Sequence, residues 1–228
     1  PAAPIRTFSL VGSADFVARD FSVLPDAVSF YVVNSQCYLP QIGRHNIANA
    51  LAAIVATSFL NVSLDQATLA LHSFKGVARR MQIIGKAHGV TVVDDFAHNP
   101  DKVAAAMQAA RPLGKRLLAI YQPHGFGPTR FLRQGFVQAF CDNLSPEDHL
   151  YMPEIYFAGG TATKDISSAD LIADVQSAGR QATYVSQRQD LPECISKIAQ
   201  AEDIVLLMGA RDPSLTELAR SILSALHK

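Results

Sequence analysis

From residue 79 onward, short apolar runs alternate with longer segments in which apolar residues recur every three or four positions. The apolar runs predict strands near 81–85, 90–94, 115–123, 149–155, 182–186 and 203–209. The segments between and after them predict helices near 101–111, 131–143, 168–178, 191–201 and 213–226. Because parallel strands need helical crossovers, this alternation predicts an α/β domain over 79–228, with a mostly parallel sheet and helices on both faces.

Residues 1–78 have a different pattern. Val- and Phe-rich segments before residue 40 predict a few short strands. A helix is expected after Gly43, and a second helix is expected over 63–72 with Ser63 or Asp65 as its N-cap. These elements offer no matching sheet, so we expect this region to be only part of a domain.

Composition excludes several classes of protein. The 20 basic and 20 acidic residues give a formal net charge of +0, which does not favour binding to nucleic acid. The longest apolar stretch, 50–60, is shorter than the ~20 residues that span a bilayer, and the N-terminus does not resemble a signal peptide. The three cysteines are far apart, which predicts neither a zinc site nor a disulfide framework and fits a reducing, cytoplasmic location.

The stretch VVDDFAHNP (92–100) places four polar side chains, Asp94, Asp95, His98 and Asn99, at the end of a predicted strand. In open α/β sheets ligands bind at the carboxyl ends of strands, so carboxylates here could accept ribose hydroxyls or organise a metal. The alternative is capping, with Asn99 as the N-cap of the next helix and an aspartate accepting bonds from loop amides. The residues alone leave both readings open.

Two more loops follow predicted strands. In YQPHGFGPTR (121–130), His124 and Arg130 flank a Gly- and Pro-rich segment, and Arg130 with Arg133 could hold a carboxylate or phosphate, although an ordinary loop is an equal alternative. In GARDPSLTEL (209–218), Asp212 or Ser214 can cap the final helix, and Ser214 with Glu217 fits a capping box, so structural capping is the favoured interpretation.

In GRHNIANA (43–50), Asn46 and Asn49 lie three residues apart on one face of a helix's first turn, where amides suit the edge of an adenine base. The simpler interpretation is a helix cap. Arg79 and Arg80 in VARRM could be a solvated basic pair. The sequence contains neither G-x-x-x-x-G-K-[ST], nor G-x-G-x-x-G, nor G-x-S-x-G. A complete ATP- or NAD-using enzyme is therefore not visible in these residues.

Five stretches, GRHNIANALAA, FKGVARRMQIIG, VVDDFAHNPDKV, YQPHGFGPTR and YFAGG, occur in an order that resembles the Mur ligase family of ATP-dependent amide-bond ligases in bacterial peptidoglycan synthesis and recycling. The resemblance is nearest to the branches that add L-alanine or recycle murein tripeptide. It covers the chain from about Gly43 onward. It implies that 1–78 is the end of the central, ATP-binding domain and that 79–228 is the Rossmann-like third domain.

The resemblance also implies roles for single residues. The adenine of ATP would contact Asn46 and Asn49, and its ribose and phosphates would contact Arg80 and Asp95. The residues beside the incoming substrate would be His98, Asn99, His124 and Arg130. His98 and Asp95 would be catalytic. The phosphate loop and most contacts to ATP and Mg²⁺ would lie upstream of Pro1, so that the fragment would be inactive without the upstream domains.

The implied reaction joins an amino acid or peptide to a UDP-N-acetylmuramate-type carboxylate through an acyl phosphate. Gly125 stands where the alanine-adding branch has an arginine, and GARDPSL replaces its glycine- and asparagine-containing turn, so the acceptor stays open. Two alternatives remain. One is a stand-alone nucleotide- or peptide-binding α/β module without catalysis, and the other is a related ligase such as folylpolyglutamate or cyanophycin synthetase.

Overall fold

The computed structural model describes residues 4–227. The chain divides into two compact units, one up to Val77 and the other from Ala78 onward. The division lies beside the boundary that the sequence places between residues 78 and 79. Each unit has its own core and is described by itself.

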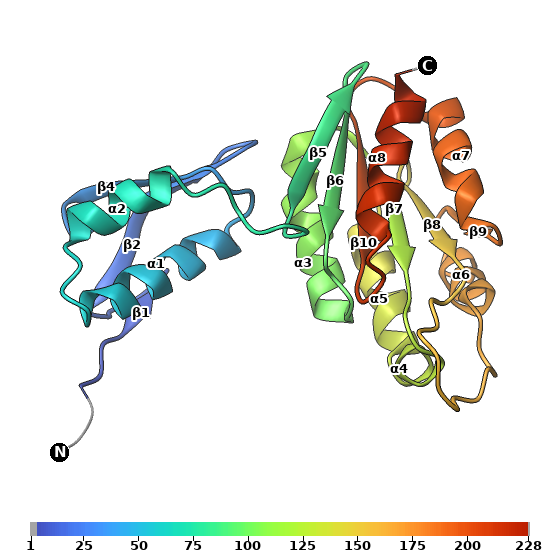
Figure 1. The fold of residues 1–228 in the computed structure, drawn as a ribbon, viewed down its shortest axis with the longest axis horizontal. Helices are drawn as coiled ribbons and strands as arrows, with labels where there is room; N and C mark the ends of the chain where they lie inside the picture. The colour runs from blue at the N-terminus through green and yellow to red at the C-terminus, as the bar shows by residue number, and fades with distance from the viewer. Residues whose placement is uncertain (1–3, 228) are drawn as a thin grey trace. The chain divides into compact units, whose positions relative to one another are not determined.

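The first unit is a four-stranded sheet with two helices (Figure 1). Its elements are β1 (Phe8–Ser9), β2 (Phe16–Val23), β3 (Val28–Val32), β4 (Ser35–Leu39), α1 (His45–Ser58) and α2 (Leu64–His72). β1 is parallel to β2, and the other pairs are antiparallel. The expectation of unmatched strands is wrong, because the Val- and Phe-rich segments pair with one another and bury alternate residues against α1.

The core of this unit forms because alternate residues of the strands and every third or fourth residue of α1 are apolar. Phe30, Val32 and Cys37 point inward from neighbouring strands and meet Ile47 and Leu51, one helical turn apart on α1. Ser63 is the N-cap of α2, as predicted, and its hydroxyl forms a reciprocal capping box with the Gln66 side chain.

The second unit is the predicted α/β domain. Its strands are β5 (Gln82–Ala87), β6 (Val90–Asp95), β7 (Arg116–Gln122), β8 (His149–Pro153), β9 (Ala182–Val185) and β10 (Asp203–Gly209). Its helices are α3 (Pro100–Ala110), α4 (Phe126–Phe131), α5 (Arg133–Asn143), α6 (Ser168–Ser177), α7 (Leu191–Ile198) and α8 (Leu215–Leu226), with 3₁₀ turns at Arg111–Leu113 and Arg188–Asp190. Apart from α4, these elements match the predictions to within a few residues.

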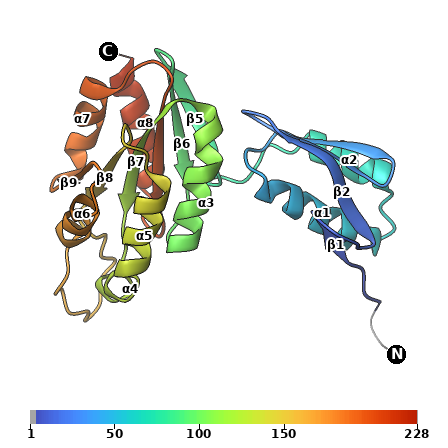
Figure 2. The same ribbon diagram turned by 180° about the vertical axis from the view of Figure 1, so that it is seen from behind.

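The sheet order is β5-β6-β10-β7-β8-β9. All neighbours are parallel except β5 and β6, which form a hairpin whose turn residues His88 and Gly89 both have positive φ. Helices α7 and α8 cover one face (Figure 1), and α3, α5 and α6 cover the other (Figure 2). β6 and β10 are buried along their whole length, which explains the continuous apolar run IVLLM in β10.

The sequence does not predict α4, which lies inside the stretch interpreted as a loop. Gly125 has φ +72°, and its carbonyl accepts a hydrogen bond from the amide of Thr129, 3.1 Å away. This turn leads directly into a short helix. The loop is therefore shorter than its Gly and Pro content indicates.

Candidate functional site

Three loops meet at one edge of the second sheet because β6, β10 and β7 are parallel neighbours. Asp95 at the end of β6 is in register with Met208 of β10, and Gly209 of β10 is in register with Gln122 of β7. The three loops, 96–99, 123–125 and 210–214, therefore start at the same level. This is the edge at which open α/β sheets bind ligands.

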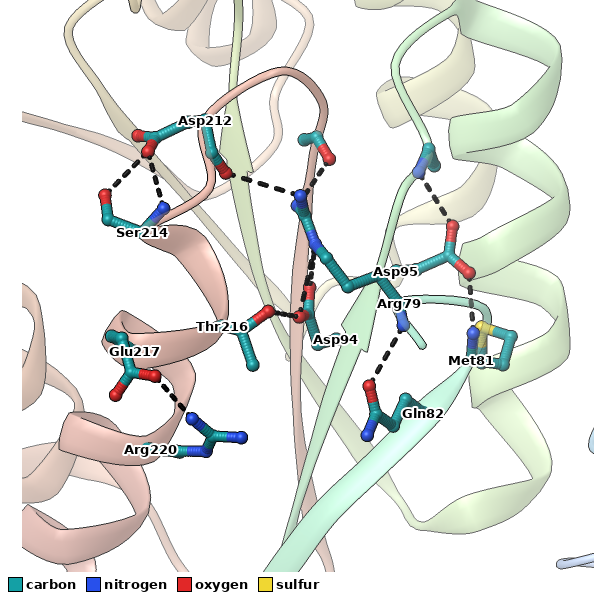
Figure 3. Close-up of polar contacts among 12 residues, drawn as sticks. Arg79, Met81, Gln82, Asp94, Asp95, Asp212, Ser214, Thr216, Glu217 and Arg220 are labelled. Atoms are coloured by element: carbon teal, nitrogen blue, oxygen red, sulfur yellow. Dashed lines mark hydrogen bonds and ion pairs between the residues drawn. The ribbon is translucent and has the colours of Figure 1, made fainter. Parts of the chain in front are cut away.

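Asp94 is a structural carboxylate beneath this edge (Figure 3). Its side chain is fully buried and lies against the guanidinium of Arg79, with Nε 3.4 Å from Oδ1. The hydroxyl of Thr216 on α8 donates to Oδ2 at 2.7 Å. Arg79 also donates to the carbonyl oxygens of Gly209 at 2.8 Å and Asp212 at 3.3 Å. The pair thus joins three segments of the unit and leaves Asp94 little freedom for a ligand.

Asp95 is also buried and accepts bonds from two backbone amides. Met81 N–H donates to Oδ2 at 2.7 Å, and Ala97 N–H donates to Oδ1 at 2.8 Å (Figure 3). Burial raises the pKa of Asp95, although the two amides and Arg80 oppose the rise. The expectation that an aspartate accepts loop amides is confirmed. Each oxygen keeps a second lone pair, so a ribose contact stays a prediction.

Arg80, Phe96, His98 and His124 form a row along the edge. The guanidinium carbon of Arg80 lies 5.8 Å from the Phe96 ring centroid, the Phe96 and His98 rings are 5.5 Å apart, and the His98 and His124 rings are 6.1 Å apart. We call these four residues the edge row. The row brings together three of the predicted site residues, Arg80, His98 and His124.

The two histidines of the edge row have distinct environments. His98 Nδ1 lies 2.9 Å from the carbonyl of Phe96. A carbonyl only accepts, so Nδ1 carries the proton of this hydrogen bond. In the neutral imidazole, Nε2 is then the nitrogen that can accept. Burial lowers the pKa of His124 below its ordinary value, and Arg211 and His98 lower it further. His124 is therefore a neutral imidazole near pH 7 and can accept a proton.

Asn99 caps α3, as the sequence allowed. Its side-chain oxygen accepts a hydrogen bond from Lys102 N–H at 2.9 Å, and Pro100 occupies the first helical position. The side chain is only partly buried and retains its amide donors. Contact with a substrate stays a prediction for this residue.

Arg130 lies on α4 and forms an ion pair with Asp165 in the loop between β8 and α6. Arg133 is paired with Asp174 at 2.7 Å. The loop between β8 and α6 also places Lys164 over two rings. Its Nζ lies 5.9 Å from the centroid of Phe126 and 4.9 Å from that of Phe157. Only Nη1 of Arg130 contacts Asp165, which leaves other N–H donors of the guanidinium, and its predicted role stays untested.

The loop after β10 differs from its prediction. Ser214 has φ −85° and ψ −1°, a helical conformation in which its hydroxyl does not cap α8. The hydroxyl donates to Asp212 Oδ1 at 2.6 Å, and Glu217 pairs with Arg220. The predicted capping box is wrong because the buried carboxylate of Asp212 takes both the hydroxyl and the N–H of Ser214.

In the first unit, Asn46 and Asn49 lie in the first turn of α1, three residues apart as predicted. Asn46 Nδ2 donates to the carbonyl of Ile42 at 2.8 Å, and Asn49 Nδ2 donates to Asn46 Oδ1 at 3.0 Å. Neither asparagine is the N-cap, which is Arg44. Asn49 is exposed with a free carbonyl oxygen, so the adenine contact remains a prediction.

Sequence reasoning treated Arg79 as a solvated arginine and missed Arg188 and Arg211. Arg188 donates to Gln122 at 2.9 Å and Ser214 at 2.8 Å, and it forms an ion pair with Asp212. No local signal marks these partners, which lie far away in sequence. In the range 4–227, no three His, Cys, Asp or Glu side chains gather as a metal site requires.

The second unit is therefore a Rossmann-like α/β domain, with a mostly parallel sheet and polar loops gathered at its carboxyl edge. A family model described as "Mur ligase, glutamate ligase domain" matches residues 79–211. This match covers more than half of the chain, which therefore belongs to the Mur ligase family.

Curated relatives are UDP-N-acetylmuramate–L-alanine ligases. The protein from Geobacter sulfurreducens is 39% identical over 212 residues, which is 90% of this chain and 45% of the relative. The protein from Lachnospira eligens is 37% identical over 171 residues, 75% of this chain and 36% of the relative. The chain thus spans less than half the length of these relatives.

Solved structures show the same fold. The UDP-N-acetylmuramate–alanine ligase from Thermotoga maritima matches with a TM-score of 0.76 and 24% identity, over 97% of this chain and 47% of that one. The MurF ligase from the same organism, solved in complex with ADP, matches with a TM-score of 0.65 and 14% identity, over 97% of this chain and 48% of that one. In the part of the chain that the structure describes, no helix is long and apolar enough to cross a bilayer.

Proposed function

We propose that this chain is part of an ATP-dependent ligase that joins an amino acid or peptide to a UDP-N-acetylmuramate-type carboxylate. The supporting observation is the edge row, which collects cationic and proton-accepting side chains at the ligand-binding edge of a Mur ligase domain. The upstream domains of the same enzyme would be its partners, and it would act in the cytoplasm.

On the nucleotide side, the amides of Asn46 and Asn49 would contact adenine. Arg80 and Asp95 would contact the ribose and phosphates. Arg80 is exposed and has no ion-pair partner among the described residues, so its guanidinium is free for an anion. Asp95 also fixes Met81, just before β5, and Ala97, in the loop after β6, so that it positions the neighbouring Arg80 as well as offering an acceptor.

On the substrate side, His98, Asn99, His124 and Arg130 would face the incoming amine. An ammonium group must lose a proton before it attacks an acyl carbon. His98 Nε2 and the neutral His124 are both able to take that proton, which is the catalytic role that we assign to His98. Asn99 and Arg130 would orient the substrate.

ATP, when bound, would supply the phosphoryl group that activates the carboxylate. The described residues fit contacts to a base, a ribose and an anion, but they hold no acidic cluster for a metal. In the full-length ligase, Mg²⁺ and the triphosphate would therefore be held mainly by a region that corresponds to the part of the relatives outside the match.

The first test is calorimetric titration of this chain with ATP and magnesium. We expect Asn49→Ala and Arg80→Gln to weaken binding by roughly tenfold each, the effect of losing one charge-assisted or well-placed hydrogen bond. Arg220→Gln is the matched control, because Arg220 lies on α8 and, within residues 4–227, is paired only with Glu217. Equal affinities for all four proteins would contradict these contacts. Asp95→Ala is less informative because it leaves the backbone amides of Met81 and Ala97 without their hydrogen-bond acceptor.

The second test uses the full-length gene product. Phosphate release with a UDP-N-acetylmuramate-type substrate should require an amine from a panel of amino acids and peptides, and should fall when His98 is replaced by Ala. Hydrolysis without any dependence on the amine would contradict a ligase.

A nucleotide- or peptide-binding module without catalysis is the second candidate. Binding of ATP without phosphate release by the full-length product would favour it.

A further inference from the structure

Arg211 occupies a strained position at the site edge. It follows β10 with φ +63°, a left-handed conformation that is unfavourable for residues other than glycine, asparagine and aspartate. Residues persist in such conformations only when their surroundings hold them there, and they cluster at functional sites. Two arginines from other segments hold this loop.

The first clamp is Arg79. Its guanidinium donates to the carbonyl of Gly209 at 2.8 Å and to the carbonyl of Asp212 at 3.3 Å (Figure 3). These carbonyls lie on either side of Arg211 in sequence. Arg79 is itself fixed by Asp94, which is buried in the sheet.

The second clamp is Arg188, which follows β9. It forms an ion pair with the carboxylate of Asp212 and donates to the hydroxyl of Ser214 at 2.8 Å. Asp212 is 2% exposed, so this pair fastens the far side of the loop to the interior of the unit. Two arginines from distant parts of the chain thus hold the backbone of Arg211.

The side chain that they present is exposed and unpaired. In the described part of the chain, Arg211 has neither a hydrogen-bond partner nor an ion-pair partner. The nearest acids of the edge are engaged, Asp94 with Arg79, Asp95 with two amides and Asp212 with Arg188. Gly209 of β10 is in register with Gln122 of β7, so Arg211 and His124 each lie two residues beyond paired positions at the same edge of the sheet.

We propose that Arg211 binds an oxyanion of the reactants beside His124, with Arg79 and Arg188 as the residues that position it. The inference rests on the proposed function for the identity of the reactants. A carboxylate of the incoming amino acid or peptide and a transferred phosphoryl group share this chemistry. The planar guanidinium suits either group through paired N–H donors.

The test uses this chain with acetate or inorganic phosphate as the probe, at constant ionic strength near pH 7. Binding is followed by the NMR signals of the His124 ring. We expect Arg211→Asn to weaken binding by roughly tenfold and Arg211→Lys to weaken it less, since Lys keeps the charge but loses the fork. Asparagine tolerates left-handed backbone, so the Asn variant should keep its melting temperature.

The two probes distinguish the source of the oxyanion. Arg211-dependent binding of acetate assigns the residue to the carboxylate of the second substrate, and dependence for phosphate alone assigns it to the phosphoryl group. Arg220→Asn, which removes the same charge from α8, should leave both affinities unchanged. Equal affinity for the wild type and Arg211→Asn, or no binding to either protein, would overturn the proposal.

The positioning role of Arg188 is tested with a separate variant. Arg188→Gln keeps the Arg211 charge but releases Asp212 and Ser214, so it should weaken anion binding by a few fold if the clamp positions the guanidinium. An unchanged affinity in a folded Arg188→Gln protein would overturn the positioning role. Neither assay needs ATP or ligation, so failure here leaves the proposed ligase intact, and failure of the ligase assay leaves this result standing.

Discussion

Arg79 Nε lies 3.4 Å from Oδ1 and 3.3 Å from Oδ2 of Asp94, a carboxylate without any exposed side-chain surface. The pair connects the start of the second unit to the end of β6 and, through Arg79, to the loop after β10. One buried ion pair therefore sets the relative positions of two loops of the candidate site.

Replacing Arg79 by Met should be strongly destabilising. The change leaves a buried charge on Asp94 without its counter-ion, which costs about 3–5 kcal/mol in comparable pairs. Urea unfolding of the second unit measures the effect. In the double variant Arg79→Met/Asp94→Asn the buried charge is also gone, so the cost should be smaller than for Arg79→Met alone. A single-variant cost below about 1 kcal/mol would contradict a structural role for the pair.

Asp212 should make the stability pH-dependent. Burial raises its pKa, but the bonds from Ser214 and the ion pair with Arg188 outweigh burial and lower the pKa below its ordinary value. The stabilisation is thus present above the unfolded-state pKa and is lost as the pH falls through the folded-state pKa. We expect Asp212→Asn to cost more at about pH 6 than at about pH 3. The exposed Asp190→Asn is the control, and an equal cost at both pH values would refute the linkage.

Asn99→Ala should destabilise the second unit by about 1 kcal/mol, because α3 loses the side chain that accepts from Lys102 N–H. Asn99→Asp supplies the same acceptor and a favourable charge at the helix N-terminus, so it should retain the stability. Thermal unfolding of the three proteins measures the difference. Equal losses for Ala and Asp would indicate that the cap is not what Asn99 contributes.

Gly127 and Gly135 form a matched pair in neighbouring helices. A Cβ at Gly135 would lie 2.9 Å from Cγ of Pro100, whereas a Cβ at Gly127 would meet nothing within 4 Å. We expect Gly135→Ala to destabilise by about 1–3 kcal/mol through overpacking, and Gly127→Ala to be neutral or stabilising by up to about 1 kcal/mol. Chemical unfolding tests the contrast, and a stabilising Gly135→Ala would contradict the close packing of α5 on Pro100.

The alternation of strands and helices after residue 79 could be predicted because it depends on local periodicity. β10 was placed without error at 203–209, since a fully buried parallel strand is a continuous apolar run. The Asn99 cap followed from residue type and the adjacent Pro100. The sheet of the first unit was missed because its short strands give a weak pattern, and pairing between them is a long-range property.

The sequence by itself determined the period of each element, the Asn99 cap, the polar loop ends and the family resemblance. Only the tertiary structure decided that β10 lies between β6 and β7, and this order brings the loop of Arg211 next to the loop of His124. It also decided that Arg79 and Arg188 are clamps and that Ser214 bonds to Asp212. The physical reason is that a side chain's local pattern sets its period and capping ability, while its charged partner depends on which distant segments the sheet order makes neighbours.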